Sequence, residues 1–468
     1  MNNDTRSKVQ SVFQEIEQET GCQWQKLQGN QDLLGSFQEQ LRDQLVVESP
    51  VTEQSDALSQ SAIAVVEEAL QSESPNKVSL SANLEALFEQ QYKVYLAADI
   101  PRSLRKKQYI NASGLVMPPD HCISTIKDTL RIGAFLRGID QALTDLRQRF
   151  DGQLNIVYPA CGPFAPLLLP LLSYYREKGH YSPQDIAVTF IDIQEGAVLA
   201  LEALINKLNL DDYVEQVLCG DAISYQTNQS VHLVVLEAMQ HGFSREGHFS
   251  LARHFSSILA DDGVLIPQSV SVQATLSVAQ REYVDQWRSA SSPMSVIPFN
   301  ELDTNDQLRA KFIEERTELG EILHLDLSFL RNLKIKVLNQ DTSMTECNTV
   351  SIPHCETNHD KQTLLIYTRV NTYGDHWLNE YESGITQPLP DMSVCINFVP
   401  KEPRSGDLLV KSGDWVTFYY CFNGLPGFLA TLASEQRIAS ELNDKLDTNQ
   451  SGREPHRKSG EEVETSYD

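Results

Sequence analysis

The hydrophobic positions change their spacing twice along the chain. In the first third they recur at helical intervals, as at Val9, Phe13 and Ile16, and predict amphipathic helices. From Leu154 onward short apolar runs alternate with helical stretches, which is typical of strands and helices in a parallel sheet. Beyond Gln268 short runs rich in Val, Ile, Tyr and Phe follow one another and indicate antiparallel strands.

These changes predict an α/β fold with a doubly wound, Rossmann-like sheet, preceded by a helical N-terminal region and followed by a mostly antiparallel β-domain. A chain of 468 residues is also too long for one compact core. We expect five segments, namely a helical N-terminal region with a linker (1–85), helices leading into the functional site (86–150), the Rossmann-like domain (151–268), a β-rich, barrel-like domain (269–438) and a disordered tail (439–468).

Five short buried strands form the expected parallel sheet, and helices are expected at Ala197–Leu208 and Glu246–Leu259. The expected strands are Leu154–Tyr158, Ala187–Ile191, Val214–Leu218, His232–Leu236 and Val264–Ile266. Ligands of doubly wound sheets bind at the carboxyl ends of the strands, so the residues that follow each strand are candidates for binding.

Three of these loops carry residues suited to a nucleoside. After the first strand, Gly162 lets the backbone approach a ligand closely, although a tight structural turn gives the same pattern. After the second, Asp192 is able to accept the hydroxyls of a ribose, or to cap the next helix. After the third, Asp221 suits the edge of an adenine, or a turn. Their order on three consecutive strands favours the binding site.

Three further motifs narrow the interpretation. They are Ile126–Arg131 before the sheet, Leu236-Glu237-Ala238-Met239 with Glu246 nine residues after Glu237, and the run from Leu251 to Pro267. With the loops above, these stretches resemble class I S-adenosylmethionine-dependent methyltransferases, and more narrowly the protein arginine methyltransferase family. The resemblance covers about residues 121–270.

The resemblance implies S-adenosyl-L-methionine as the cofactor and a role for each matching residue. Arg131 would pair with the cofactor carboxylate, because a guanidinium binds a carboxylate through two parallel hydrogen bonds. Glu237 and Glu246 would hold a guanidinium as the methyl acceptor, although Glu246 also suits the start of a helix. His376, in Asp375-His376-Trp377, is a candidate general base. The implied cofactor-binding residues are Arg131, Ala160, Gly162, Asp192, Asp221 and Glu237.

The chain also departs from the family. Tyr158, Ala160 and Phe164 stand where the family has an acidic residue and glycines, and Phe164 is expected to narrow the cofactor pocket. The loop between the two glutamates carries His241 and Arg245 at positions that are more hydrophobic in the family, and Gln240 stands there too. Arg245 would place a cation beside a site meant for a cation.

Three functions therefore stay open. The first is N-methylation of arginine, or a related guanidino or amino group, in a protein or peptide. The second is methylation of a small metabolite or biosynthetic intermediate, with His241 as the base. The third is a non-catalytic scaffold that keeps the methyltransferase fold. The resemblance also makes a homodimer possible.

Composition and charge argue against several other classes of protein. The net charge of −26 disfavours nucleic acid as a partner, since phosphates would be repelled. No apolar run approaches the roughly 18–20 residues that a membrane span needs. The polar N-terminus and the scattered cysteines favour a cytoplasmic protein. No metal is expected, because Cys347, His354, Cys355 and His359 fit no standard zinc spacing.

Overall fold

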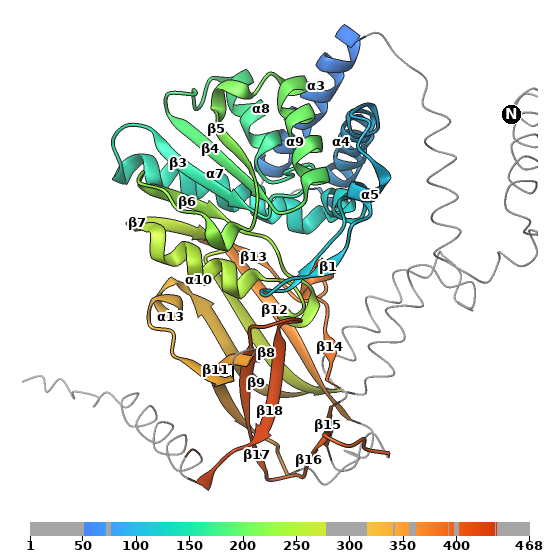
Figure 1. Ribbon diagram of the computed structural model, residues 1–468, viewed down its shortest axis with the longest axis vertical. Coiled ribbons are helices and arrows are strands. Elements are labelled where there is room, and N and C mark those ends of the chain that lie inside the picture. Colours follow the sequence, from blue (N-terminus) through green and yellow to red (C-terminus); the bar gives the residue numbers. More distant parts are fainter. Residues whose placement is uncertain are drawn as a thin grey trace, which may run out of the picture.

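The computed structural model describes residues 51–71, 76–277, 316–339, 342–354, 362–391, 393–396, 402–435 and 437. The helices expected within residues 1–48 and the tail expected from residue 439 lie outside these ranges. Figure 1 shows an α/β unit joined to a β-rich unit, with the chain passing from one to the other between β7 and β8.

The α/β unit is built on five parallel strands in the order β5-β4-β3-β6-β7. They are β3 (Leu154–Pro159), β4 (Ile186–Asp192), β5 (Val214–Cys219), β6 (Val231–Val235) and β7 (Leu259–Ile266). The chain runs outward from β3 to β5 and returns to the other side of β3 at β6. This order confirms the doubly wound sheet, and it places the switch point between β3 and β6.

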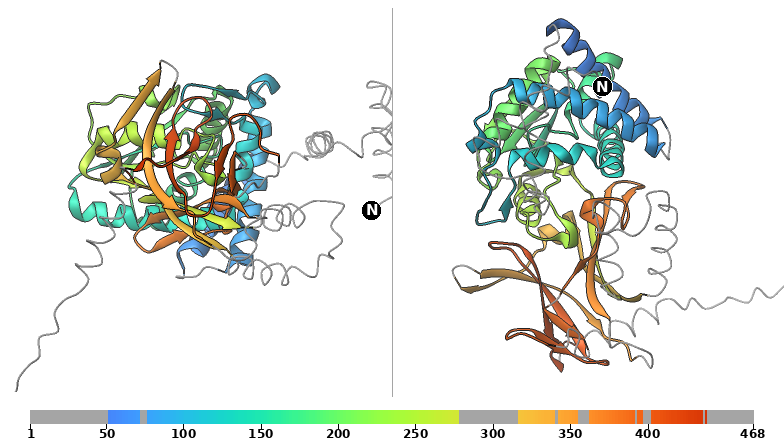
Figure 2. Two further views of the ribbon diagram at one scale, coloured as in Figure 1. Left: turned by 90° about the horizontal axis from the view of Figure 1, so that it is seen from below. Right: turned by 90° about the vertical axis from the view of Figure 1, so that its right-hand side faces the viewer.

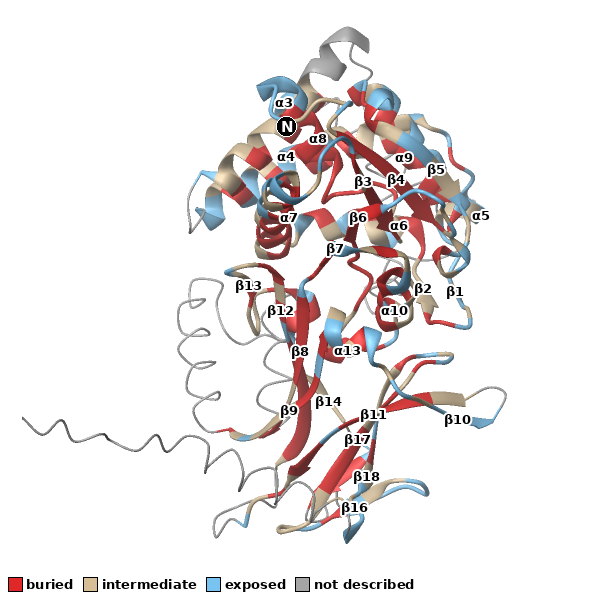
Figure 3. Cartoon of the chain, turned by 90° about the vertical axis from the view of Figure 1, so that its left-hand side faces the viewer, coloured by how far each residue is buried: buried red, intermediate tan, exposed pale blue. Residues whose placement is uncertain are grey.

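Helices cover both faces of this sheet, so its central strands are buried throughout. All seven residues of β4 and all five of β6 are buried, as expected for strands packed on two sides. The covering helices include α7 (Thr129–Arg149), α8 (Leu169–Lys178), α9 (Glu195–Leu208) and α10 (His248–Ile258). Within the α/β unit, Figure 3 shows many of the buried residues in the sheet and in α7.

Two helices ahead of the sheet, α3 (Val51–Leu70) and α4 (Lys77–Ala97), belong to the same packing. α3 contacts α7 and α8, and α4 contacts α9. The buried side chains of Val65, Leu84 and Leu87 lie in one apolar core with those of β3 and β4. Figures 1 and 2 show both helices against the α/β unit and away from the β-rich unit.

A short hairpin follows α4 and α5 (Arg102–Arg105). Its strands β1 (Tyr109–Ile110) and β2 (Leu115–Val116) are antiparallel. The Asn111 side-chain oxygen accepts hydrogen bonds from the backbone N–H groups of Ser113 and Gly114, at 2.9 and 2.8 Å. The turn of the hairpin is therefore fixed by its own side chain.

The helices expected within residues 86–150 end in a short helix, a turn and a long helix. α6 (Pro119–Cys122) continues into a 3-10 turn over Ile123–Lys127, and α7 begins at Thr129. The turn brings Asp128 and Arg131 to the carboxyl side of the sheet.

The β-rich unit consists mainly of two antiparallel sheets, which confirms the mostly antiparallel prediction. The first contains β13 (His376–Leu378), β12 (Thr363–Tyr373), β8 (Ser269–Ser277) and β9 (Thr317–Asp326), with β14 (Leu389–Pro390) paired to β12. The second contains β10 (Ile335–Asn339), β11 (Thr342–Ser351), β17 (Trp415–Cys421) and β18 (Gly427–Leu432). β15 (Val394–Ile396) and β16 (Leu408–Val410) form a separate parallel pair.

Candidate active site

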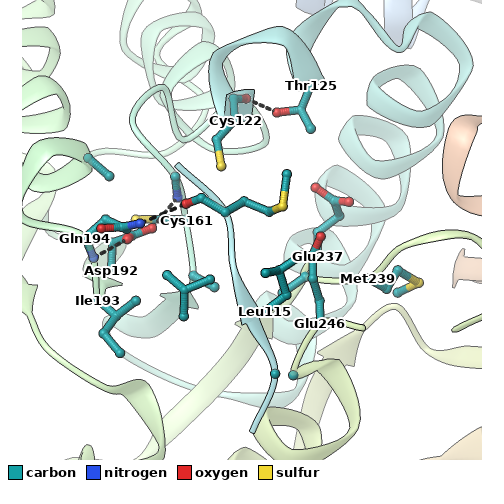
Figure 4. A pocket seen from close by; sticks show the side chains of 18 of the residues that line it. Leu115, Cys122, Thr125, Cys161, Asp192, Ile193, Gln194, Glu237, Met239 and Glu246 are labelled. Carbon is teal, nitrogen blue, oxygen red and sulfur yellow. Dashed lines mark hydrogen bonds between the residues drawn. The ribbon is translucent and has the colours of Figure 1, made fainter. Parts of the chain in front are cut away.

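A cavity of about 390 Å³ lies at the carboxyl ends of β3, β4 and β6. Every residue predicted to bind the cofactor lines it, as does Glu246. Figure 4 shows Glu237 and Glu246 at one end of the cavity and Asp192 and Gln194 at the other. The cavity therefore has acidic side chains at two ends.

The loop after β3 turns through left-handed backbone conformations. Ala160 has φ of 51° and Gly162 has φ of 68°. The Gly162 N–H donates to Asp192 Oδ2 at 2.9 Å, and the Gln194 N–H donates to Asp192 Oδ1 at 2.8 Å. The N-cap of α9 is Gln194, so Asp192 does not cap that helix but joins the ends of two strands.

Burial changes the acidity of Asp192. Removal from water raises the pKa of its carboxyl group to about 6, and the N–H groups of Gln194 and Gly162 oppose the rise. Asp192 is therefore close to its titration midpoint under mildly acidic conditions. Its lone pairs that are not used by these two N–H groups remain for a ligand hydroxyl.

Asp221 combines the two alternatives that the sequence leaves open. It lines the cavity, and it is also the N-cap of the 3-10 turn over Ala222–Ser224, where its Oδ1 accepts from the Ile223 N–H at 3.1 Å. Its side chain is exposed. The 3-10 turn therefore fixes the Asp221 carboxylate at the rim of the cavity.

Phe164 does not fill the cavity, although it lines one wall. Its ring packs against Phe88 and Tyr95 of α4, with centroid distances of 6.2 and 5.9 Å. The bulky residue in the first loop is therefore accommodated by an aromatic cluster outside the sheet. The sequence did not indicate this packing, because the partners lie far away in the chain.

Gln194 is a site residue that sequence reasoning missed. Its side-chain Nε2 donates to the carbonyl oxygens of Lys107 and Met117, at 2.5 and 3.0 Å. These carbonyls bracket the β1–β2 hairpin, so a single amide holds both ends of the hairpin against the cavity. A glutamine beside an expected ribose-binding aspartate carries no signal that would predict this contact.

At the other end, Arg131 of α7 forms an ion pair with Glu237, which follows β6. The two side chains are only 9% and 5% exposed. Arg131 Nη1 also lies 3.9 Å from Asp128 Oδ2. Burial lowers the pKa of Arg131, and the nearby carboxylates Asp128 and Glu246 oppose that change. The two residues that the resemblance assigns to the cofactor and the acceptor are therefore direct partners.

The double-glutamate loop (residues 237–246) is held at its backbone from two sides. The Leu115 N–H of the hairpin donates to the Arg245 carbonyl at 2.7 Å, and the Arg245 N–H donates to the Pro426 carbonyl at 2.7 Å. Gly242, Phe243 and Arg245 all have positive φ. The Arg245 side chain is exposed and does not line the cavity, so the cation expected beside the site is not part of the cavity wall.

His241 lines the cavity as a neutral candidate base. Burial, and secondarily the charge of Arg245, lowers its pKa. Beside it, Glu246 accepts a hydrogen bond at Oε1 from Gln240 Nε2 at 2.9 Å.

The β-rich unit reaches the cavity through Gly384 and Ile385, not through His376. Ser383 Oγ and the Gly384 N–H donate to Asp128 Oδ2, at 2.5 and 3.2 Å. His376 lies on β13, which packs against α7, and its pKa is lowered by burial first and then by Arg137. The short polar turn at Ser383 and Gly384 carries no sequence pattern that marks it as part of a site. The His376-Trp377 pair does resemble a motif, and for that reason the sequence favoured it.

Two other expectations concern metals and membranes. Within the described residues no group of three His, Cys, Asp or Glu side chains could hold a metal ion. Cys355 and His359 lie outside those residues. Among the described helices, none combines the length and the apolarity needed to cross a bilayer.

Comparisons with known proteins give structural neighbours only. No family model matches the chain, and no curated protein matches it. One similar structure is titled "Trypanosoma brucei PRMT1 enzyme-prozyme heterotetrameric complex with AdoHcy", with 14% identity, a TM-score of 0.36, and coverage of 68% of this chain and 94% of that one. Another is Arabidopsis thaliana Protein Arginine Methyltransferase 10, with 13% identity, a TM-score of 0.35, and coverage of 67% and 97%. The fold is identified by the strand order and strand directions.

Proposed function

We propose that this protein is an S-adenosylmethionine-dependent methyltransferase that methylates a guanidino or amino nitrogen. The observation that carries the proposal is the cavity at the switch point of the sheet, with Asp192 at one end and the Glu237–Glu246 pair at the other. A nucleoside joined to an amino acid is elongated and needs polar groups at both ends. The cofactor-binding residues and the two glutamates that the motifs predict all line this cavity, whereas His376 does not.

The residues around the cavity fit this cofactor. A Cβ placed on Gly220 would meet no described atom within 4 Å, and one placed on Gly162 would meet only Cys122 Cβ, at 3.9 Å. Both glycines therefore border open space. Arg131 Nε is buried with no hydrogen-bond partner among the described residues. An unpartnered guanidinium N–H suits the carboxylate of a bound amino acid.

S-adenosylmethionine would supply a methyl group on a positively charged sulfur. Asp192 would accept the ribose hydroxyls, and Arg131 would bind the carboxylate. Glu237 and Glu246 would orient the acceptor nitrogen and stabilise the positive charge that it gains during transfer. Such catalysis depends mainly on positioning and electrostatics. His241, which lines the cavity from the double-glutamate loop, would be a candidate base.

A small acceptor is the second candidate, and the hairpin is the observation that favours it. The main chain at Gly114 lies so close to the double-glutamate loop that a Cβ there would be 2.7 Å from the Gly247 nitrogen. The loop is thus covered by the hairpin on one side and by Pro426 on another. This cover leaves less room for a folded protein than for a small guanidino or amino compound.

Calorimetric titration with S-adenosylmethionine, with an Asp192→Ala variant beside it, tests the cofactor. Micromolar binding that the variant loses would support both enzyme candidates. The opposite result is that the unaltered protein shows no binding at millimolar S-adenosylmethionine, with or without an arginine-rich peptide. That result would exclude both enzyme candidates and favour the non-catalytic scaffold.

Transfer of labelled methyl to an arginine-rich peptide and to free arginine then separates the two acceptor classes. Turnover of the peptide that Glu237→Gln and Glu246→Gln abolish would support peptidyl arginine. Turnover of free arginine alone would support the small acceptor. A homodimer and a cytoplasmic location stay predictions.

A further inference from the structure

Gln240 is the side chain that contacts Glu246. Its Nε2 donates to Glu246 Oε1 at 2.9 Å and lies 3.5 Å from Met117 Sδ. Among the described residues no other donor bonds to the Glu246 carboxylate. We propose that Gln240 is a positioning residue that fixes Glu246 with a neutral donor and so leaves its charge for a cationic acceptor. This inference rests on the proposed function.

The two glutamates of the loop have different partners. Glu237 is paired with the buried cation Arg131, so its charge is compensated within the protein. Glu246 receives a hydrogen bond from an uncharged amide, which orients the carboxylate without neutralising it. Among the described residues no cation forms an ion pair with Glu246, although the charge of Arg131 acts on it from farther away. A cationic nitrogen that enters the cavity would therefore find the available carboxylate at Glu246.

The backbone around Glu246 explains why its side chain needs an anchor. An isolated bridge joins Gln240 to Ser244, and the loop then passes through Arg245 with φ of 67°. These contacts fix the main chain, but they do not set the rotamer of the long Glu246 side chain, and holding such a side chain in one rotamer costs conformational entropy. Because Gln240 lies on the opposite limb of the same loop, its amide selects one of them.

The acidity of Glu246 depends on the same contact. Burial raises its pKa, while the Gln240 amide and the charge of Arg131 oppose the rise. The titratable groups that line the cavity from the elements around Glu246 are His121, Cys122 and Arg131 from the helices, Tyr158 from β3, and Glu237 and His241 from the loop. Without the Gln240 amide donor, only the charge of Arg131 would oppose the rise in the Glu246 pKa that burial causes.

The test compares Gln240→Met, which keeps the length of the side chain but removes the donor, with Gln240→Glu, which keeps its shape. Gln153→Met is the matched control, since its Nε2 also donates one hydrogen bond, to the Pro183 carbonyl at 2.7 Å, outside the cavity. The Glu246 carboxyl is titrated by carbon NMR in protein labelled at glutamate, with the signal assigned by Glu246→Gln. Methyl transfer to an arginine-rich peptide and to free arginine is measured from pH 6 to 9.

The expected result is a Glu246 titration that moves to higher pH in Gln240→Met and stays in place in Gln153→Met. In Gln240→Glu two carboxyl groups would share a proton, so the pair would titrate higher still. The acidic limb of kcat/KM would move to higher pH with it, so the loss of kcat/KM in Gln240→Met would be larger at pH 6 than at pH 9. The affinity for S-adenosylmethionine would change little.

An unshifted Glu246 titration in both Gln240 variants would overturn the inference. So would a fall in kcat/KM that is equal at every pH, since that indicates only a loss of packing. The NMR titration needs no turnover. If the unaltered protein fails to bind S-adenosylmethionine, the proposed function is wrong, and the pKa comparison still decides whether Gln240 controls Glu246.

Discussion

Arg131 and Glu237 are ion-paired inside the protein, one projecting from α7 and the other following β6. The pair joins the helix before the sheet to the double-glutamate loop. It also means that a ligand carboxylate at Arg131 and a ligand cation at Glu237 would each meet a group that already has a partner. Binding at one end of this pair is therefore coupled to binding at the other.

Removal of one member of the pair should be more damaging than removal of both. Arg131→Met leaves Glu237 buried without its cation, and we expect the free energy of unfolding to fall by about 3 kcal/mol. The double variant Arg131→Met/Glu237→Leu should recover most of that loss while binding no S-adenosylmethionine. Urea unfolding measures the stability. An Arg131→Met protein as stable as the unaltered one would contradict the buried pair.

The raised pKa of Asp192 has opposite consequences for cofactor binding and for folding. The ionised carboxylate accepts ribose hydroxyls, so affinity for S-adenosylmethionine should fall as the pH drops through about 6. The folded pKa lies above the unfolded value of 3.8, so the stability contribution of this group is full below pH 4 and is lost as the pH rises through about 6. Calorimetry and unfolding at pH 5.5 and 7.5 measure both. Asp192→Asn should remove the pH dependence of the affinity and that of the stability. A pH dependence that survives in Asp192→Asn would have to come from another titrating group.

Ala160 occupies a left-handed conformation with φ of 51°, which a Cβ disfavours by about 1 kcal/mol. Ala160→Gly should therefore fold at least as stably as the unaltered protein, because the relief of strain offsets the added freedom of the unfolded chain. Ala160→Val should lose about 2 kcal/mol or more, since a β-branched residue tolerates this conformation poorly. Thermal unfolding gives both values. Equal stability of the two variants would be inconsistent with the turn.

Gly114 tests whether the hairpin has to rest on the double-glutamate loop. A methyl group there would lie 2.7 to 2.9 Å from backbone atoms of residues 245–247, so Gly114→Ala should lift the hairpin. We expect S-adenosylmethionine to dissociate about tenfold faster by stopped-flow measurement, as a cover that no longer closes releases its ligand sooner. Gly152→Ala is the control, because that position has φ of 81° but no described atom within 4 Å of the added carbon. An unchanged dissociation rate in Gly114→Ala would mean that the hairpin is not a cover.

His376 was the expected base, and its position predicts a negative result. His376→Gln should change kcat/KM by less than about twofold, since β13 faces α7 and not the cavity. Ser383→Ala, which removes the hydroxyl donor to Asp128, should have the larger effect. The comparison uses the acceptor identified by methyl transfer. A large loss in His376→Gln with normal Ser383→Ala activity would return the histidine to the site.

The pattern of hydrophobic residues along the chain predicted the helices and strands well, but it predicted the contacts between them poorly. Alternation of apolar runs with helical stretches predicted all five strands of the parallel sheet. The signal was clearest at β4 and β6, where every residue is buried, whereas the edge strand β5 has no buried residue and was placed by its spacing between helices. Asp192 and Asp221 were found because the residue after a strand has a known place at the sheet edge. Gln194, Gln240 and Ser383 were not found, since their roles depend on partners brought together only by folding. Polar amides and hydroxyls are common at protein surfaces, and they do not recur along the chain at a spacing that would mark a site.

α3 and α4 have a practical consequence for anyone who prepares a shortened protein. A chain cut just after α4 would lose the buried side chains of that helix, including Leu80, Leu84 and Leu87, and would expose the apolar surfaces of α7, α8 and α9 that the two helices contact. Each such side chain is worth roughly 1.5–3 kcal/mol of burial, so a few of them equal the whole stability of an ordinary domain. The smallest version that can be expected to refold from denaturant therefore starts ahead of Val51, far upstream of the first nucleotide-binding loop.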